Sequence, residues 1–122
     1  MLRFDGLYVS EAHTSTTGTQ LVYYSYLRFY DDGTVISVPS TGLPHEVAMW
    51  FDRANVGTST GTYTLQNTSL VFFTSLRIED EGTVEEITVD YGGAVEEDSL
   101  KLRSRSLFNG HEAVETYTFA AV

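Results

Sequence analysis

The sequence has no cysteine and only two prolines among its 122 residues. Without cysteine there is no disulfide framework and no thiolate chemistry, and any metal site would need histidine and carboxylate ligands. This absence favours a reducing compartment. No apolar run is long enough to span a bilayer, and the first residues lack the apolar stretch of a signal peptide. We therefore expect a soluble, cytoplasmic protein.

Basic residues are also scarce, because seven Lys and Arg stand against seventeen Asp and Glu, for a formal net charge of −10. Such a charge repels phosphate groups, so we expect neither nucleic acid nor a membrane surface as a partner. The asymmetry is local: residues 79–98 contain nine acids and no base, and Lys101, Arg103 and Arg105 follow. We expect these acidic and basic residues to pair across neighbouring strands.

The residues that are plentiful suit a β core, since 42% of the chain is hydrophobic and 13% is aromatic. The length fits one domain spanning residues 1–122. Turn-forming residues recur at short intervals, as in Asp31-Asp32-Gly33, Glu81-Gly82, Gly92-Gly93 and Asn109-Gly110, and the last is a strong hairpin signal. Strands are predicted between the turns, at residues 4–10, 19–30, 33–39, 60–66, 69–76, 83–91, 99–107 and 112–119.

Eight sequential strands with short turns predict a mainly β fold, a single antiparallel up-and-down barrel, with a two-sheet sandwich as the alternative. One short helix is predicted over residues 43–55, where apolar residues recur at steps of four, three and four. Pro44 suits its first turn, and Gly57 lies just past its end. Trp50 belongs to its apolar face, and together with Met49 it is expected to line the mouth of an internal cavity.

Alternation within residues 19–30 separates two faces of the predicted strand. The odd-numbered face includes Leu27 and Phe29 and is expected to face the interior. The opposite face carries three tyrosines and an arginine. We expect this outward stripe to pack under the helix or to form a subunit contact, because large exposed aromatic patches are uncommon on monomers.

Signals for catalysis are weak. The chain lacks the common hydrolase, phosphate-loop and two-histidine zinc motifs. Its three histidines, His13, His45 and His111, are far apart, so each is expected to be a surface residue, and we predict no metal site and no cofactor. Among the acids, Glu115 shares strand parity with Tyr117 and is the best candidate for a carboxylate that faces inward.

Two stretches carry a resemblance to known families. Tyr24 to Val35, followed by Pro44 and Glu46 and then by Gly61-Thr62-Tyr63, resembles the β-rich domain that follows the F-box in a subset of F-box proteins. Gly6-Leu7-Tyr8 is similar to the opening of lipocalin-like, or calycin, barrels, which commonly have Trp where this chain has Tyr. Both resemblances imply a small barrel with a binding habit, and neither implies a catalytic residue or a ubiquitin-ligase role.

Two hypotheses of function remain. The first is non-catalytic binding of a small apolar or aromatic ligand inside the barrel. The residues expected to line that site are Tyr23, Phe29, Met49, Trp50, Tyr63, Phe72 and Tyr117. The alternative is a protein–protein interaction module or homodimer, because Tyr and Arg are favoured at interfaces. Its expected contact residues are Tyr24, Tyr26, Arg28 and Tyr30. An enzyme ranks third, and it would need a buried carboxylate with a shifted pKa beside a tyrosine.

Overall fold

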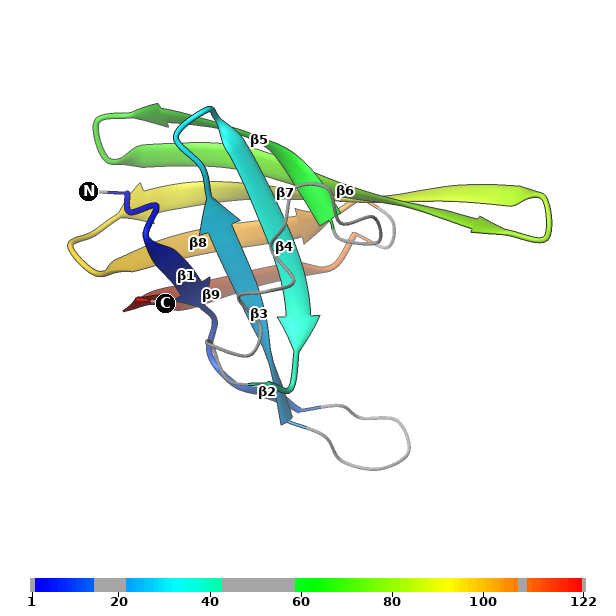
Figure 1. Ribbon diagram of the computed structural model, residues 1–122, viewed down its shortest axis with the longest axis horizontal. Coiled ribbons are helices and arrows are strands. Elements are labelled where there is room, and N and C mark those ends of the chain that lie inside the picture. The colour runs from blue at the N-terminus through cyan, green and yellow to red at the C-terminus, as the bar shows by residue number, and fades with distance from the viewer. Residues whose placement is uncertain (1, 15–21, 43–58, 108–109, 122) are drawn as a thin grey trace.

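The computed structural model describes residues 2–14, 22–42, 59–107 and 110–121, and the regular structure in these ranges is entirely β-strand (Figure 1). The strands are β1 Gly6–Val9, β2 His13–Thr14, β3 Val22–Phe29, β4 Thr34–Ser40, β5 Ser59–Gln66, β6 Ser69–Asp80, β7 Thr83–Val95, β8 Ser99–Ser106 and β9 Glu112–Ala121.

The sheet is closed by β1, which pairs with β9 on one side and with β3 on the other. Gly6 lies opposite Ala121, and Tyr8 lies opposite Leu27. Strands β3 to β9 follow one another around the barrel in chain order, all antiparallel, and the two-residue β2 extends the edge of β3. The predicted eight-stranded antiparallel barrel is therefore confirmed, and each of the eight predicted segments contains a strand.

The turns follow from local chemistry in most places. Glu81 and Gly82 both have positive φ, at 48° and 81°, as a two-residue type I′ hairpin turn requires. Before β4, Gly33 has a φ of 95°, and the backbone N–H of Thr34 donates to the Asp32 carboxylate at 3.0 Å. Gly110 also has positive φ, while its predicted turn partner Asn109 lies outside the described residues.

One predicted turn is wrong. Gly92-Gly93 lies inside β7, which continues to Val95 and pairs with β8 from Val89 to Val95. The reason is packing rather than chain reversal, because a Cβ on Gly93 would overlap the backbone carbonyl oxygen of Lys101 on β8. The glycine allows a close approach of two strands.

The interior is filled with aromatic and aliphatic side chains. Phe29, fully buried, lies at its centre, and its ring makes edge contacts with the rings of Tyr8, Tyr63 and Phe72 at centroid distances of 5.7, 5.4 and 5.3 Å. Tyr91 stacks on Phe72 at 4.4 Å. The buried members of this core are Leu2, Tyr8, Leu27, Phe29, Val35, Leu70, Phe72, Val95, Leu100, Leu102 and Tyr117.

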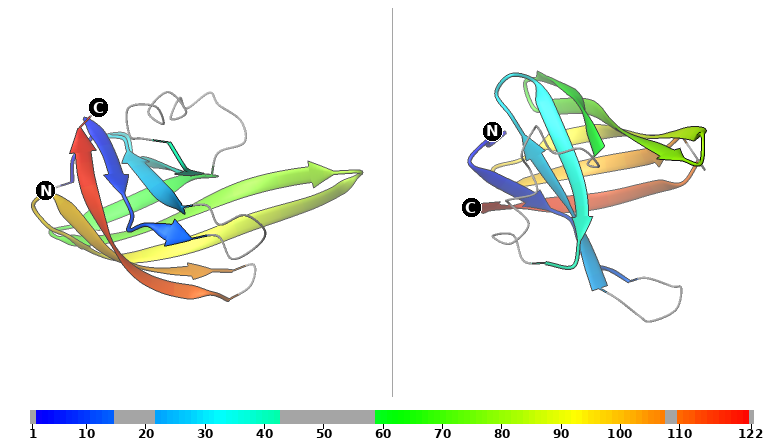
Figure 2. Two further views of the ribbon diagram at one scale, coloured as in Figure 1. Left: turned by 90° about the horizontal axis from the view of Figure 1, so that it is seen from below. Right: turned by 45° about the vertical axis from the view of Figure 1, so that its right-hand side comes forward.

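The hairpin of β6 and β7 is much longer than its neighbours. β5 pairs with β6 only as far as Ser75, and β8 pairs with β7 only from Val89. Residues 76–87 therefore form a two-stranded arm, which projects from the barrel in every view (Figure 1 and Figure 2). We call this segment the arm.

The predicted helix at residues 43–55, with Met49 and Trp50, lies outside the described residues. Within the described ranges, no helix has the length and hydropathy needed to cross a lipid bilayer.

Candidate functional site

One end of the barrel interior is closed by the N-terminal segment. Leu2 is buried in the core, and the backbone N–H of Arg3 donates to the Tyr8 hydroxyl at 2.9 Å. The Arg3 guanidinium lies 3.9 Å from the ring centroid of Phe119 and also pairs with Asp98 at 3.1 Å. Leu2 and the contact of Arg3 with Phe119 thus cover this end of the barrel.

The other end of the interior is polar, and Glu115 is its central group. On β9, Glu115 alternates with the core residue Tyr117, so both side chains face inward. Only 13% of the Glu115 side chain is exposed, and its Oε2 lies 2.8 Å from Nε2 of His13. The prediction that Glu115 faces inward is thus confirmed, whereas the expectation that His13 is merely a surface residue missed this pair.

His13 reaches Glu115 because the N-terminal strand changes course at Ser10. The Ser10 N–H donates to the carbonyl of Ser25, and the Ser25 N–H donates to the Ser10 hydroxyl rather than to a backbone carbonyl. Beyond this irregular step β2 pairs with β3, and His13 lies opposite Tyr23. The two rings stack with centroids 5.2 Å apart.

The barrel seam is the line along which the N-terminal strands β1 and β2 meet β9. Beyond Val9, side chains rather than a backbone ladder bridge this seam. β1 pairs with β9 as far as Val9 opposite Thr118, and among the described residues no ladder joins β2 to β9. Instead, the Glu11 carboxylate accepts the backbone N–H of Thr116 at 3.4 Å, and His13 pairs with Glu115. A seam held by side chains opens more easily than one held by a backbone ladder.

Burial governs the protonation of this polar end. It raises the pKa of Glu115 above its ordinary value, although the charge of His13 opposes the change. Burial also raises the pKa of Tyr117, and the negative charge of Glu115 adds to the effect. The pKa of Tyr91 is raised in the same way, while its hydrogen bonds with Ser37 and Thr74 counteract the burial. The result is a low-dielectric environment that holds one carboxylate and neutral phenols.

The residues predicted to line a ligand site fall into two groups. Phe29, Tyr63 and Phe72 contact one another and fill the barrel axis, and the Tyr63 hydroxyl donates to the Tyr30 carbonyl at 2.5 Å. Tyr23 and Tyr117 belong to the polar end. Tyr23 on β3 stacks on His13, and Tyr117 follows Glu115 by two residues on β9. The structure therefore brings Phe29, Tyr63, Phe72 and Tyr117 onto one interior with a packed centre, whereas the predicted Met49 and Trp50 lie outside the described residues.

The predicted outward stripe is not an exposed surface. Tyr26 is only 1% exposed and forms a second buried cluster with Leu7 and Ile36, and its hydroxyl donates to the Gly42 carbonyl at 2.5 Å. Tyr24 and Tyr30 pack against the same cluster and are half-buried. Leu7 and Ile36 lie beside Tyr26 on the same face of the sheet, and all three are at most 1% exposed. The half-buried fourth member of the stripe, Arg28, lies with its guanidinium 5.5 Å from the ring centroid of Tyr30.

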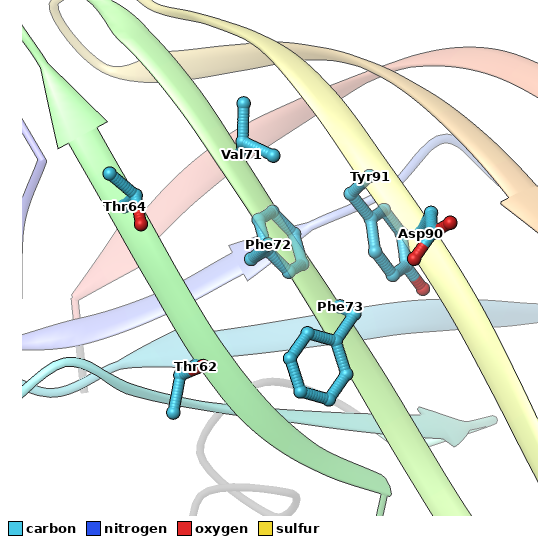
Figure 3. A pocket seen from close by; sticks show the side chains of 7 residues that line it. All are labelled: Thr62, Thr64, Val71, Phe72, Phe73, Asp90 and Tyr91. Atoms are coloured by element: carbon cyan, nitrogen blue, oxygen red, sulfur yellow. The ribbon is translucent and has the colours of Figure 1, made fainter.

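Two of the hollows that the described residues form lie on the outer, solvent-facing side of strands β5 to β9. One has a volume of about 410 Å³ and is shown in Figure 3, where its lining side chains come from three adjacent strands. Its lining residues are Thr62, Thr64, Val71, Phe72, Phe73, Asp90 and Tyr91. The second, of about 280 Å³, adjoins it and is lined by Asp90, Tyr91, Gly92, Arg103, Arg105 and Glu112.

Comparisons with known proteins add no family, because no family model, no curated protein and no solved structure matches this chain. Across the described part of the chain, no three His, Asp or Glu side chains are grouped so as to hold a metal ion. The polar end of the barrel combines the buried carboxylate of Glu115 with the aromatic rings and hydroxyls of Tyr23 and Tyr117.

Proposed function

We propose that the barrel binds a small molecule at its polar end, and that the ligand combines an apolar or aromatic body with a protonated amine. The observation that carries this proposal is the Glu115 carboxylate, which faces the interior with a side chain only 13% exposed. An inward carboxylate costs folding free energy through lost hydration, so its presence beside aromatic walls suits the capture of a cation.

The surroundings select the ligand's charge and shape. A cation gains both from the carboxylate and from the faces of Tyr23 and Tyr117, whereas an anion would meet Glu115 and a net charge of −10. The lipocalin-like resemblance of Gly6-Leu7-Tyr8 points the same way, since such barrels commonly hold one small ligand. The bridged seam between β2 and β9 supplies an entry that needs no backbone ladder to break.

His13 marks where the ligand's amine would lie. When protonated, its imidazole offers Glu115 the positive charge that an amine would offer, and its ring stacks on Tyr23 as an aromatic ligand would. Ligand binding would therefore replace the His13–Glu115 pair by a pair between the ligand's amine and Glu115, and the Glu115 carboxylate would stay paired.

The test is a titration with phenethylamine and tryptamine, followed by calorimetry and by amide chemical shifts, with the corresponding arylalkyl carboxylic acids as charge controls. Because a hydrogen bond to a charged group contributes about 1.5–3 kcal/mol, Glu115→Gln should weaken amine binding at least tenfold. Glu112→Gln is the matched control, since Glu112 lies on the same strand but is exposed on the outer face. Equal affinity for amines and acids, or unchanged amine binding in Glu115→Gln, would refute the proposal.

A further inference from the structure

The ion pair at the polar end of the barrel joins a carboxylate to a group whose charge depends on pH. Nε2 of His13 lies 2.8 Å from Oε2 of Glu115, and the two side chains are 31% and 13% exposed. An imidazole ordinarily gains its proton between about pH 5 and 8. No hydrogen bond of good geometry reaches the buried Oε2 atom from the described residues, so the imidazole N–H lies near this atom but is not aligned with it. The attraction between the two side chains therefore depends on the charge of the imidazole.

A second carboxylate, that of Glu11, also acts on Glu115. Burial raises the pKa of Glu115 most, the charge of His13 opposes this change, and the negative charge of Glu11 adds to it. Glu11 lies between β1 and β2, and its carboxylate accepts the backbone N–H of Thr116 at 3.4 Å. Two neighbouring negative charges at this end of the barrel favour a cation beside them.

The other groups packed around the pair are phenols and apolar side chains. From β3, the ring of Tyr23 stacks on the imidazole with centroids 5.2 Å apart. Burial raises the pKa values of Tyr91 on β7 and Tyr117 on β9, and the charge of the carboxylate adds to both effects. On β8, the residue opposite the carboxylate is the buried Leu102. Among these described neighbours, His13 is thus the group that can supply a positive charge.

We propose that His13 is a built-in competitor of the ligand's amine, so that the barrel holds an amine at neutral and alkaline pH and releases it in acid. This inference rests on the amine site proposed above at Glu115. In acid the imidazolium takes the position beside the carboxylate that the amine needs, whereas at higher pH the neutral imidazole leaves a buried carboxylate without a counter-charge. Acid also protonates the carboxyl itself, and because burial raises the pKa of Glu115, this loss acts in the same direction.

The seam gives this exchange a short path. Within the described residues no backbone ladder joins β2 to β9, and β2 pairs with β3 through only two residues, His13 and Thr14. The imidazole can therefore move away from Glu115 while the ladder between β1 and β9 stays intact. An arylalkyl amine that enters here places its ammonium group at Oε2, which has no aligned donor, and its ring beside Tyr23.

Calorimetric titration of the full chain with phenethylamine, which stays protonated throughout, tests the competition at about pH 6 and about pH 8.5. The native chain should bind about tenfold more weakly at the lower pH, because the imidazolium must first be displaced from a charged pair. His13→Gln keeps a polar side chain without a titrating charge, so its affinity should change less than about threefold, and at the higher pH it should match the native chain. His111→Gln is the matched control, since His111 is exposed and lies just before β9, and it should keep the native pH dependence.

A second measurement uses the native chain alone. If the amine displaces an imidazolium, part of a proton leaves His13 on binding. Calorimetry near pH 7 in phosphate and in HEPES, two buffers that differ in ionisation enthalpy, measures this release. The native chain should release a fraction of one proton per bound amine, and His13→Gln should release none.

The outcomes separate this inference from the proposed function. If phenethylamine binds at neither pH, the amine site itself fails, and the competition fails with it. If the amine binds and Glu115→Gln weakens it, but acid weakens the native chain and His13→Gln equally, the amine site stands and only the competition is overturned. Binding to the native chain without any proton release would overturn the competition in the same way.

Discussion

Replacing Phe29 with alanine measures whether the barrel axis is packed or open. Phe29 is fully buried, and three aromatic rings contact it. A buried Phe side chain covers 150–250 Å² in general, so at about 25 cal/mol per Å² its removal costs roughly 4–6 kcal/mol. Core Phe→Ala substitutions cost about 3–5 kcal/mol, and we therefore expect about 4 kcal/mol here.

Urea unfolding followed by tryptophan fluorescence or circular dichroism checks this value. With a slope of about 2 kcal/mol per M, the unfolding midpoint should fall by about 2 M. Phe73→Ala is the matched control, because Phe73 lies on the outer face, is 42% exposed and should cost only about 1 kcal/mol. If the two substitutions lowered the midpoint equally, Phe29 would line open space and the packed-axis interpretation would fail.

Three further predictions concern the seam, the sheet and a turn. Burial raises the pKa of Glu115, so its ionised form costs stability above that pKa, and the cost disappears as the pH falls through it. Glu115→Gln should therefore raise the unfolding midpoint at neutral pH, and urea titrations at lower pH should show the gain shrinking toward about pH 4.3. A persistent gain at low pH would contradict this assignment. Gly93→Ala should cost about 1–3 kcal/mol because its Cβ would overlap a β8 carbonyl oxygen, as thermal unfolding would show. Gly92→Ala, whose Cβ would meet nothing within 4 Å, should leave stability within about 0.5 kcal/mol of the native value. Tyr63→Phe removes the hydrogen bond to the Tyr30 carbonyl and should cost about 1 kcal/mol in the same assay, and a neutral result would show that water replaces the bond.

Sequence patterns predicted the barrel well because strand and turn signals are local. Glu81-Gly82 and Gly33 take the positive φ that their composition indicates, and strand parity placed both Phe29 and Glu115 on the interior face. These features depend on residues within one or two positions of each other, so a single amino-acid sequence is enough to predict them.

Features that depend on distant neighbours escaped prediction. Gly93 looks like a turn residue until the backbone of β8 lies against it. The pair of His13 with Glu115 joins positions more than a hundred residues apart, and no local spacing signals it. In each case the missing information was which residues of distant strands lie next to one another.

The closure of the barrel by β1 has a consequence for folding. Gly6 pairs with Ala121, so the contact that closes the sheet joins the two most distant strands of the described chain. Strands β3 to β9 can form hairpin by hairpin as they are synthesised, but the N-terminal strand must wait for the last of them before it can join both edges. Until then the edges of β3 and β9 offer unpaired backbone groups to any other extended chain. Newly made molecules should therefore aggregate most readily just before β1 docks, and faster docking would protect them without any change in the stability of the finished barrel.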